Sequence, residues 1–150
     1  FNDKVNEFLG MAADFDGFFF GTPVHWAASD GFLTSFLSRA FFVCQNGGVD
    51  TFYLKPAAGV VSARRAGTTS TWDQINKYFG LMQMPIVTSQ YWNHVHGRTP
   101  DEVRQDIEGM QTMRTLARNM AYMLRCKEAA KKAGVPLPKR EPVILTDFIH

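Results

Sequence analysis

The sequence predicts a single α/β domain in which a parallel sheet is covered by helices on both faces. Three short apolar runs have the length of strands, and they alternate with segments whose apolar residues recur every three or four positions. The first two runs are apolar on successive residues, which is typical of strands buried on both faces. Three helix–strand pairs followed by a fourth helix therefore favour parallel strands joined by helical crossovers.

The first half of the chain contains two of the expected helices and one strand. A helix is expected over residues 2–13, with Asn2 or Asp3 as its cap. The phenylalanine-rich run 18–20 forms the first strand, which stops at Gly21, and the following Thr-Pro pair is expected to turn the chain. A second helix is expected from residues 29–30 to about residue 44.

The second half begins with the small-residue run 57–63, which we expect to be the second strand. A helix is expected to start near Ser70, where Ser70 with Asp73, or Thr71 with Gln74, has the spacing of a capping box. Residues 84–89 are the expected third strand. The segment 90–97, rich in aromatic residues and histidine, is the expected loop after it.

One long helix is expected after that loop. Thr99 has the position of a cap, Pro100 that of the first helical residue, and Glu102 follows the cap by three residues. The apolar stripe extends to about Lys132. In the tail beyond it, the apolar residues 143–145 are expected to dock on the domain or on a neighbouring molecule.

Composition excludes several classes of function. The 150 residues are 45% hydrophobic and 20% charged, which is a globular composition, and a net charge of +2 gives no reason to expect a nucleic-acid partner. No apolar run has the length of a membrane span, and the first residues lack the pattern of a signal peptide. The two cysteines have no metal-binding spacing and are expected to be free thiols. We therefore expect a cytoplasmic protein.

The histidines do not predict a metal centre. His94 and His96 are two residues apart, but no cluster of carboxylates or cysteines accompanies them in the sequence. The sequence also lacks the motifs of serine nucleophiles, Walker loops and dinucleotide-binding turns. No metal ligand and no catalytic nucleophile is assigned.

Two consecutive strand-to-helix loops have unusual compositions. The first, GTPVHW, offers flat apolar surface, and the second, SARRAGTT, offers two guanidinium groups, hydroxyls and the N–H groups of a helix start. Loops at the carboxyl ends of adjacent parallel strands face the same crevice. Together they suit a flat anionic ligand with polar edges. The alternative is that the first loop is a structural aromatic turn and that the arginine pair is solvated.

The motifs in these loops resemble a known family. The series GTPVHW, VVSARRAGTTSTWDQIN, MPIVTSQYWNHVHG and DIEGMQTMRTLARNM is similar to the flavodoxin-like NADPH-dependent FMN reductases, in particular to their iron–sulfur flavoprotein and multimeric quinone-reductase branch. The resemblance covers roughly residues 14–126. It implies a flavodoxin-like three-layer sandwich, FMN as cofactor and NAD(P)H as co-substrate.

The resemblance also implies which residues hold the flavin. Its isoalloxazine would lie against the first loop, formed by Thr22, Pro23, Val24, His25 and Trp26. Its pyrimidine edge would be held by the second loop, formed by Ser62, Ala63, Arg64, Arg65, Gly67 and Thr68. Hydride would pass through the flavin to a quinone, another flavin or a similar small acceptor, and no acid–base residue is required. Family members are usually dimers or tetramers, so the segment 91–93 and the long helix are interface candidates.

The chain departs from the family pattern in three respects. His25 stands where the family often has tyrosine, and Ala66 stands where a second glycine is common. The strands and the phosphate-binding loop that begin the family fold are not among these 150 residues, which correspond to its C-terminal two-thirds. We therefore expect the phenylalanine strand to be an exposed edge unless more of the chain, or another copy, covers it. The alternatives to an enzyme are a non-catalytic FMN-binding electron carrier and a truncated interaction domain.

Overall fold

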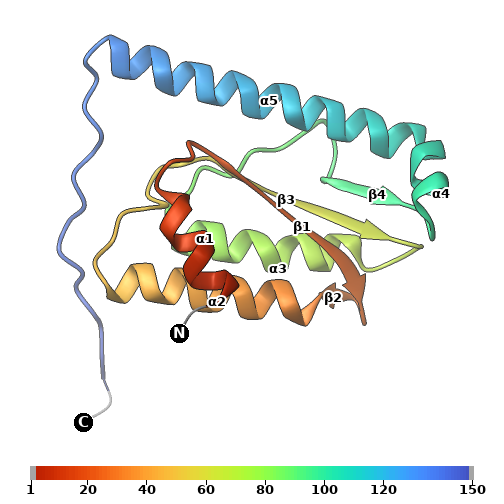
Figure 1. The fold of residues 1–150 in the computed structure, drawn as a ribbon, viewed down its shortest axis with the longest axis horizontal. Helices are drawn as coiled ribbons and strands as arrows, with labels where there is room; N and C mark the ends of the chain where they lie inside the picture. The colour runs from red at the N-terminus through yellow and green to blue at the C-terminus, as the bar shows by residue number, and fades with distance from the viewer. Residues whose placement is uncertain (1–2, 149–150) are drawn as a thin grey trace.

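The computed structural model describes residues 3–148 and has a four-stranded, mostly parallel sheet (Figure 1). The strand order is β2-β1-β3-β4, in which β1, β3 and β4 are parallel and β2 is antiparallel to β1. The strands are β1 (Phe18–His25), β2 (Ala28–Ser29), β3 (Ala57–Ala63) and β4 (His94–His96). The predicted α/β architecture is therefore confirmed.

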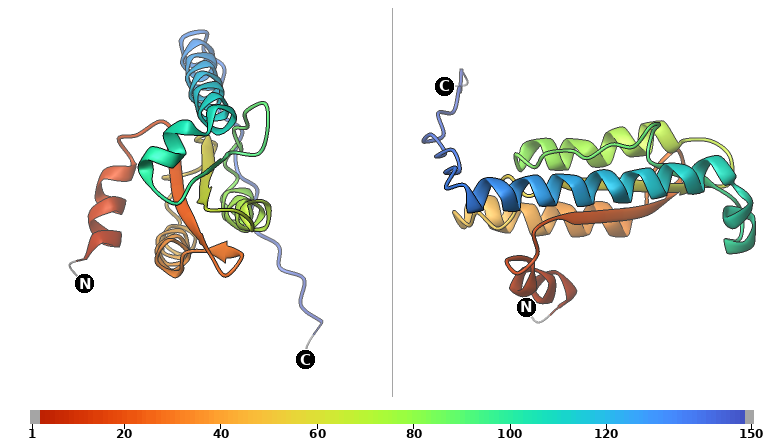
Figure 2. Two further views of the ribbon diagram at one scale, coloured as in Figure 1. Left: turned by 90° about the vertical axis from the view of Figure 1, so that its right-hand side faces the viewer. Right: turned by 90° about the horizontal axis from the view of Figure 1, so that it is seen from above.

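Helices cover both faces of this sheet (Figure 2). Helices α1, α2 and α3 pack on one face, and α5 lies across the other, with the short α4 before it. Their bounds are α1 (Lys4–Ala12), α2 (Gly31–Asn46), α3 (Thr68–Leu81), α4 (Pro100–Gln105) and α5 (Ile107–Lys132). No helix within residues 3–148 is both long and apolar enough to cross a membrane.

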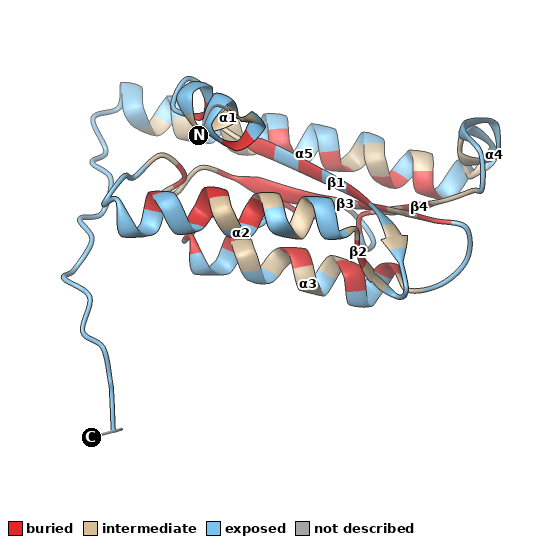
Figure 3. Ribbon diagram, turned by 60° about the horizontal axis from the view of Figure 1, so that its bottom comes forward, coloured by how far each residue is buried: buried red, intermediate tan, exposed pale blue. Residues whose placement is uncertain are grey.

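A cluster of phenylalanine rings fills the core between the sheet and helices α1–α3. Figure 3 shows buried residues, in red, along β1, β3 and helices α2 and α3. Phe52, from the loop before β3, is completely buried and lies between other rings. Its ring centroid is 4.8 Å from that of Phe41 and 5.2 Å from that of Phe18, both in edge-to-face geometry. Such pairs add to the free energy of burial, so this cluster anchors β1 against α2.

Strand β1 is covered on one face only, contrary to the expectation of burial on both. Phe18 and Phe20 are buried, whereas Phe19, on the opposite face, is 51% exposed. The reason is that α5 lies over β3, where Leu116 and Met120 pack with Ala58. Before its last two residues, β1 pairs with β3 alone among the described residues, so the expected edge strand is confirmed.

The chain turns later than the sequence indicated. Thr22 and Pro23 remain in β1, and the reversal occurs at Trp26 and Ala27, which connect β1 to the unforeseen strand β2. Both residues have positive φ, 53° and 59°, as a two-residue hairpin turn requires. Glycine or asparagine normally fills such positions, because a Cβ atom strains them. Pro23 is tolerated because β1 lies at an edge there.

Three of the four predicted helix starts are confirmed, and one is wrong. Asp3 caps α1 and Asp30 caps α2, while Thr99 caps α4 as predicted. Asn2, the alternative cap of α1, lies outside the described residues. Helix α3 begins at Thr68 rather than near Ser70, and its cap, Gly67, makes no side-chain hydrogen bond. The predicted capping box is absent because the first turn of α3 packs against the hairpin instead.

The expected third strand, residues 84–89, is not a continuous strand. Only Ile86 forms a bridge to β3, and regular pairing resumes at β4, inside the expected loop. The buried Asn93 closes the intervening bulge, because its Nδ2 donates to the carbonyl of Val87 at 3.2 Å while its Oδ1 accepts from the Ser89 hydroxyl at 2.8 Å. A buried amide satisfied in this way holds the excursion in one shape.

The predicted long helix is in fact two helices. Asp106, with ψ of 82°, separates α4 from α5 and caps α5 by accepting from the N–H of Gly109 at 2.9 Å. In the tail, Arg140 forms an ion pair with Asp50 at 2.7 Å. The expected docking of residues 143–145 is not seen within the described chain, where their side chains are largely exposed.

Replacement of Phe52 tests the importance of the phenylalanine cluster. We expect Phe52→Ala to lower the free energy of unfolding by about 3–5 kcal/mol, because it leaves a cavity among close-packed rings. Phe42→Ala is the control, since Phe42 lies on the exposed side of α2, and its effect should stay within about 0.5 kcal/mol. Urea unfolding of both variants measures the difference, and equal losses would contradict the proposed anchor.

Candidate functional site

The two unusual loops leave the sheet side by side. Strands β1 and β3 are parallel neighbours, and Pro23 lies opposite Ser62 in their register. Each loop therefore begins at the same level of the sheet, at its carboxyl edge. This is the position at which open α/β sheets bind ligands.

The loops are also in contact beyond the ends of the strands. Gly67 has a φ of 91°, and a Cβ atom there would lie 2.8 Å from both the Cα of Ala27 and a methyl group of Val24. The hydroxyl of Ser70 donates to the carbonyl of Ala27 at 2.7 Å. The predicted juxtaposition of the two loops is confirmed, and only a glycine permits so close an approach.

The base of the first loop is held by buried hydroxyl groups. The Thr22 hydroxyl accepts from the backbone N–H of Asp30 at 3.0 Å and lies 3.2 Å from the Ser29 hydroxyl. Asp30 in turn caps α2 and lies 3.0 Å from Nδ1 of His25. Thr22 therefore shapes the hairpin from inside, while His25 and the fully exposed Trp26 remain at the surface.

The second loop presents donors that no described group uses. Arg64 and Arg65 are exposed, and no hydrogen bond or ion pair to another described residue occupies either guanidinium. The first turn of α3 has no side-chain cap, so its N–H groups remain available at the positive end of the helix dipole. This combination attracts an anion or an electron-rich carbonyl.

The predicted site residues fall into two groups in the structure. Exposed or half-buried positions at the carboxyl edge are Pro23, His25, Trp26, Ser62, Arg64, Arg65 and Gly67. Thr22, Ala63 and Thr68 are buried, and Val24 packs against the core. The residues of this second group can contact a ligand only through their backbone atoms. Their side chains support the loops.

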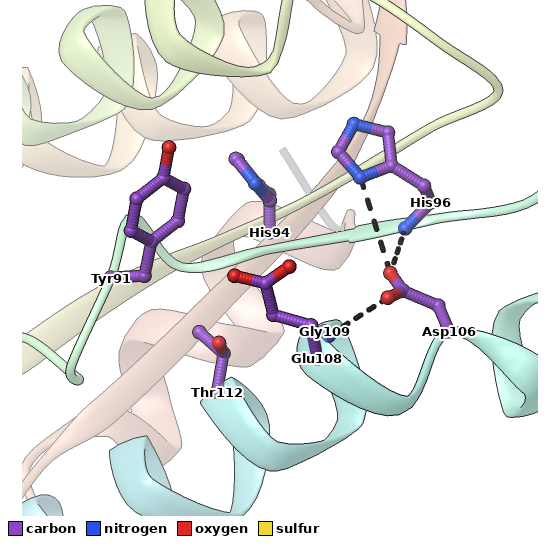
Figure 4. Close-up of a pocket in the computed structure, with 7 residues that line it drawn as sticks. All are labelled: Tyr91, His94, His96, Asp106, Glu108, Gly109 and Thr112. Carbon is purple, nitrogen blue, oxygen red and sulfur yellow. Dashed lines mark hydrogen bonds and ion pairs between the residues drawn. The ribbon is translucent and has the colours of Figure 1, made fainter.

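A polar pocket that the sequence did not indicate lies beside β4 (Figure 4). Its volume is about 300 Å³, and its lining residues are Tyr91, His94, His96, Asp106, Glu108, Gly109 and Thr112. The rings of His94 and His96 extend from the same strand with centroids 4.8 Å apart. Sequence reasoning missed the carboxylates because the break at Asp106, which directs them to β4, leaves no trace in the helical pattern.

Charges in this pocket are set by burial and by backbone donors. Burial lowers the pKa of His94, and the neighbouring His96 lowers it further, so His94 is neutral at neutral pH. Burial alone would raise the pKa of Asp106. The N–H groups of Gly109 and His96 donate to this carboxylate and, together with the charge of the imidazoles, hold its pKa below the usual range.

Among residues 3–148, no group of three or more histidine, cysteine, aspartate or glutamate side chains converges as metal ligands would. The Nδ1 atom of His94 is buried and has no hydrogen-bond partner in the described part of the chain. Asp106 is already engaged by two N–H donors, which leaves it positioned as a helix cap.

The fold is that of the flavodoxin-like proteins. A solved structure of the Trp repressor binding protein from Bacillus subtilis matches with a TM-score of 0.62 at 16% identity, over 79% of this chain and 71% of that one. RosB, solved with 8-demethyl-8-formylriboflavin-5'-phosphate, also matches with a TM-score of 0.62 at 13% identity, over 100% of this chain and 69% of that one.

The sequence family follows from two further comparisons. The family model for NADPH-dependent FMN reductase matches residues 1–99, and the chain belongs to this family. An iron–sulfur flavoprotein of Methanocaldococcus jannaschii is 26% identical over 135 residues, which are 82% of this chain. The chain spans 66% of the length of that relative. Membership in the family implies FMN as the cofactor.

The observed carboxyl edge fits one part of such a cofactor. Exposed Trp26 and Pro23 supply flat apolar surface, and the two free guanidinium groups with the uncapped start of α3 supply donors for carbonyl and ring-nitrogen acceptors. The close approach at Gly67 brings the backbones of the two loops that carry these groups together. The residues present therefore suit the ring system of a flavin.

Substitution of Gly67 tests the contact between the loops. We expect Gly67→Ala to lower the free energy of unfolding by about 2–4 kcal/mol, because the new methyl group collides with backbone atoms of the hairpin at a left-handed φ. Gly80→Ala, in the same helix but with open space around it, should stabilise the protein by up to about 1 kcal/mol. Thermal unfolding compares the two, and similar behaviour would refute the contact.

The cap at Asp106 predicts a pH dependence of stability. Its lowered pKa means that the carboxylate stabilises the fold in full above the unfolded-state pKa and loses this effect as the pH falls through the lower folded-state value. At neutral pH, Asp106→Ala should cost about 1–2 kcal/mol of unfolding free energy, and the difference from wild type should shrink below about pH 4.

The matched control for this substitution is Asp101→Ala. Asp101 is an exposed carboxylate in the first turn of α4, and its loss should change stability by no more than about 0.5 kcal/mol. Denaturant titrations between acidic and neutral pH provide the measurement. A difference between wild type and Asp106→Ala that is independent of pH would show that the cap does not act through its charge.

Proposed function

We propose that this chain forms the ring-binding part of an FMN-dependent oxidoreductase that transfers the hydride of NAD(P)H, through the flavin, to a quinone, a second flavin or a similar small acceptor. The observation that supports this most is the meeting of the two loops at Gly67. It brings the hairpin that carries Trp26 against the loop that carries Arg64 and Arg65, whose guanidinium groups have no partner among the described residues. A structural turn would not need this pairing of surfaces.

Each loop has a distinct task in this proposal. Trp26 and Pro23 give the ring system an apolar surface and exclude water from one side of it. Arg64, Arg65 and the N–H groups at the start of α3 stabilise negative charge along the pyrimidine edge. When bound, FMN supplies the capacity to accept and release a hydride equivalent, and the protein contributes position and electrostatics.

His25 has a defined orientation in the proposed site. Its Nδ1 lies 3.0 Å from the carboxylate of Asp30, so the ring is fixed at the surface and its other nitrogen faces away from this partner. Asp30 is itself held as the cap of α2. An imidazole oriented by a carboxylate presents one polar edge next to the apolar surface of Trp26.

We further propose that the protein is a cytoplasmic homo-oligomer. Tyr91 and Trp92 are both about half exposed and pack edge to face with their ring centroids 4.4 Å apart, so they form an aromatic projection. Tyr122, on α5, is another exposed aromatic residue. Aromatic side chains are enriched at protein interfaces. Sedimentation of Trp92→Ala beside wild type tests the part that this projection plays in self-association.

Removing one guanidinium group tests the flavin site. We expect Arg64→Ala in the full chain to weaken FMN binding about 10- to 100-fold, because a charge-assisted hydrogen bond is lost. It should also shift the flavin midpoint potential to more negative values, since the reduced ring loses a stabilising positive charge. Arg118→Ala, which removes the same charge from an exposed position on α5, should leave both quantities unchanged.

Two measurements separate the proposal from its alternatives. Quenching of flavin fluorescence on addition of protein reports FMN binding. If the wild-type protein does not quench this fluorescence, only the interaction-domain alternative is left. Oxidation of NAD(P)H in the presence of a quinone then distinguishes an enzyme from an electron carrier. A protein that binds FMN but does not turn over NAD(P)H with quinones or free flavins would contradict the proposed activity.

A further inference from the structure

The hairpin that carries Trp26 is strained, and its own sequence does not explain why it persists. Trp26 and Ala27 both adopt the left-handed conformation, with φ of 53° and 59°. A residue with a Cβ atom is destabilised in this conformation unless other interactions compensate. The turn contains no glycine or asparagine, and β2 pairs with β1 at only two positions, so local pairing is a weak source of compensation.

Compensation comes from the first two turns of α3. The Oε1 atom of Gln74 accepts a hydrogen bond from the backbone N–H of Ser29 at 2.9 Å. The hydroxyl of Ser70 donates to the carbonyl of Ala27 at 2.7 Å. Both interactions bind backbone atoms of the hairpin, on either side of Ala28, and both come from successive turns of one helix face.

The geometry leaves these backbone groups few other partners. Ser29 is buried, so water would not replace the Gln74 side chain as the acceptor for its N–H. Removal of that side chain would therefore leave the N–H without a hydrogen bond. Gly67 contacts Ala27 directly and prevents the turn from shifting toward α3. The hairpin is thus held on one side by its strand pairing and on the other by α3.

We propose that Ser70 and Gln74 are positioning residues that clamp the β1–β2 hairpin in the conformation that presents His25 and Trp26 to the ligand. The clamp joins the two halves of the site, because α3 begins directly after the arginine loop. A ligand held by Arg64 and Arg65 therefore meets a preformed aromatic surface. The effect of the clamp on ligand affinity rests on the proposed flavin function, whereas its effect on the hairpin does not.

Two substitutions at one position separate the clamp from the packing of the helix. Gln74→Leu keeps the bulk of the side chain and removes the acceptor, while Gln74→Glu keeps an acceptor oxygen for Ser29. Lys77→Ala is the control, because Lys77 is exposed on the same helix and no described group pairs with it. All variants are made in the full chain, and urea unfolding verifies that each is folded.

The first readout is the order of the hairpin without any ligand. The ¹H–¹⁵N heteronuclear NOE of the Trp26 and Ala27 amides should fall in Gln74→Leu and should stay at the wild-type value in Gln74→Glu and Lys77→Ala. Ser70→Ala should lower it as well, because it frees the Ala27 carbonyl. Unchanged NOE values in both Gln74→Leu and Ser70→Ala would overturn the clamp.

The second readout is FMN affinity, measured by flavin fluorescence quenching. We expect the dissociation constant to rise about tenfold in Gln74→Leu and to change by less than about twofold in Gln74→Glu and Lys77→Ala. If the hairpin loosens but affinity does not change, the positioning role is refuted. If wild type itself fails to bind FMN, the proposed function falls, and the NOE values alone decide whether the clamp exists.

Discussion

The approach of Gly67 to the β1–β2 hairpin is the constraint on which the carboxyl edge of this protein depends. It brings the backbone of the arginine loop within van der Waals contact of Ala27 and Val24. Helix α3 starts at Thr68, directly after Gly67, and a glycine in the cap position leaves the first turn of the helix without a side-chain cap. A residue with a side chain at this position would separate the loops and would disconnect the aromatic surface from the guanidinium groups. Shape and electrostatics of the candidate site thus share one structural cause.

The core supports this arrangement from below. Phe18 and Phe20 alternate with exposed positions along β1, and their rings lock the strand into the cluster around Phe52. The carboxyl end of β1 is therefore held in register with β3, which delivers Pro23 opposite Ser62. The other face of β1 has no such cover among the described residues, as the half-exposed Phe19 demonstrates. Rigidity at the site consequently comes from the α2–α3 side of the sheet.

Much of the fold and part of the site were predictable from the sequence. Apolar periodicity located α1 and α2, a run of small residues located β3, and the Asp3, Asp30 and Thr99 caps followed from local chemistry. The two loops could be paired because adjacent parallel strands share a carboxyl edge. The hairpin at Trp26 and Ala27 could not be foreseen, since neither residue favours a left-handed turn and the stabilising partner of Ser29 is Gln74, 45 residues later. The excursion closed by Asn93 likewise depends on side-chain hydrogen bonds rather than on a repeating pattern.

The sequence by itself determined the alternation of helices and strands, the edge position of the phenylalanine strand and the family to which the loop motifs point. The alternation follows from residue spacing and composition, which act over a few positions along the chain, whereas the edge position followed from the resemblance of the loop motifs to the family. Tertiary structure alone decided that Thr22 supports the hairpin from inside, that α3 grips the turn carrying Trp26, and that Asp106 divides the last helix to enclose a polar pocket with His94. Each of these outcomes requires a hydrogen bond or a close approach between elements, and such contacts exist only after the elements have packed.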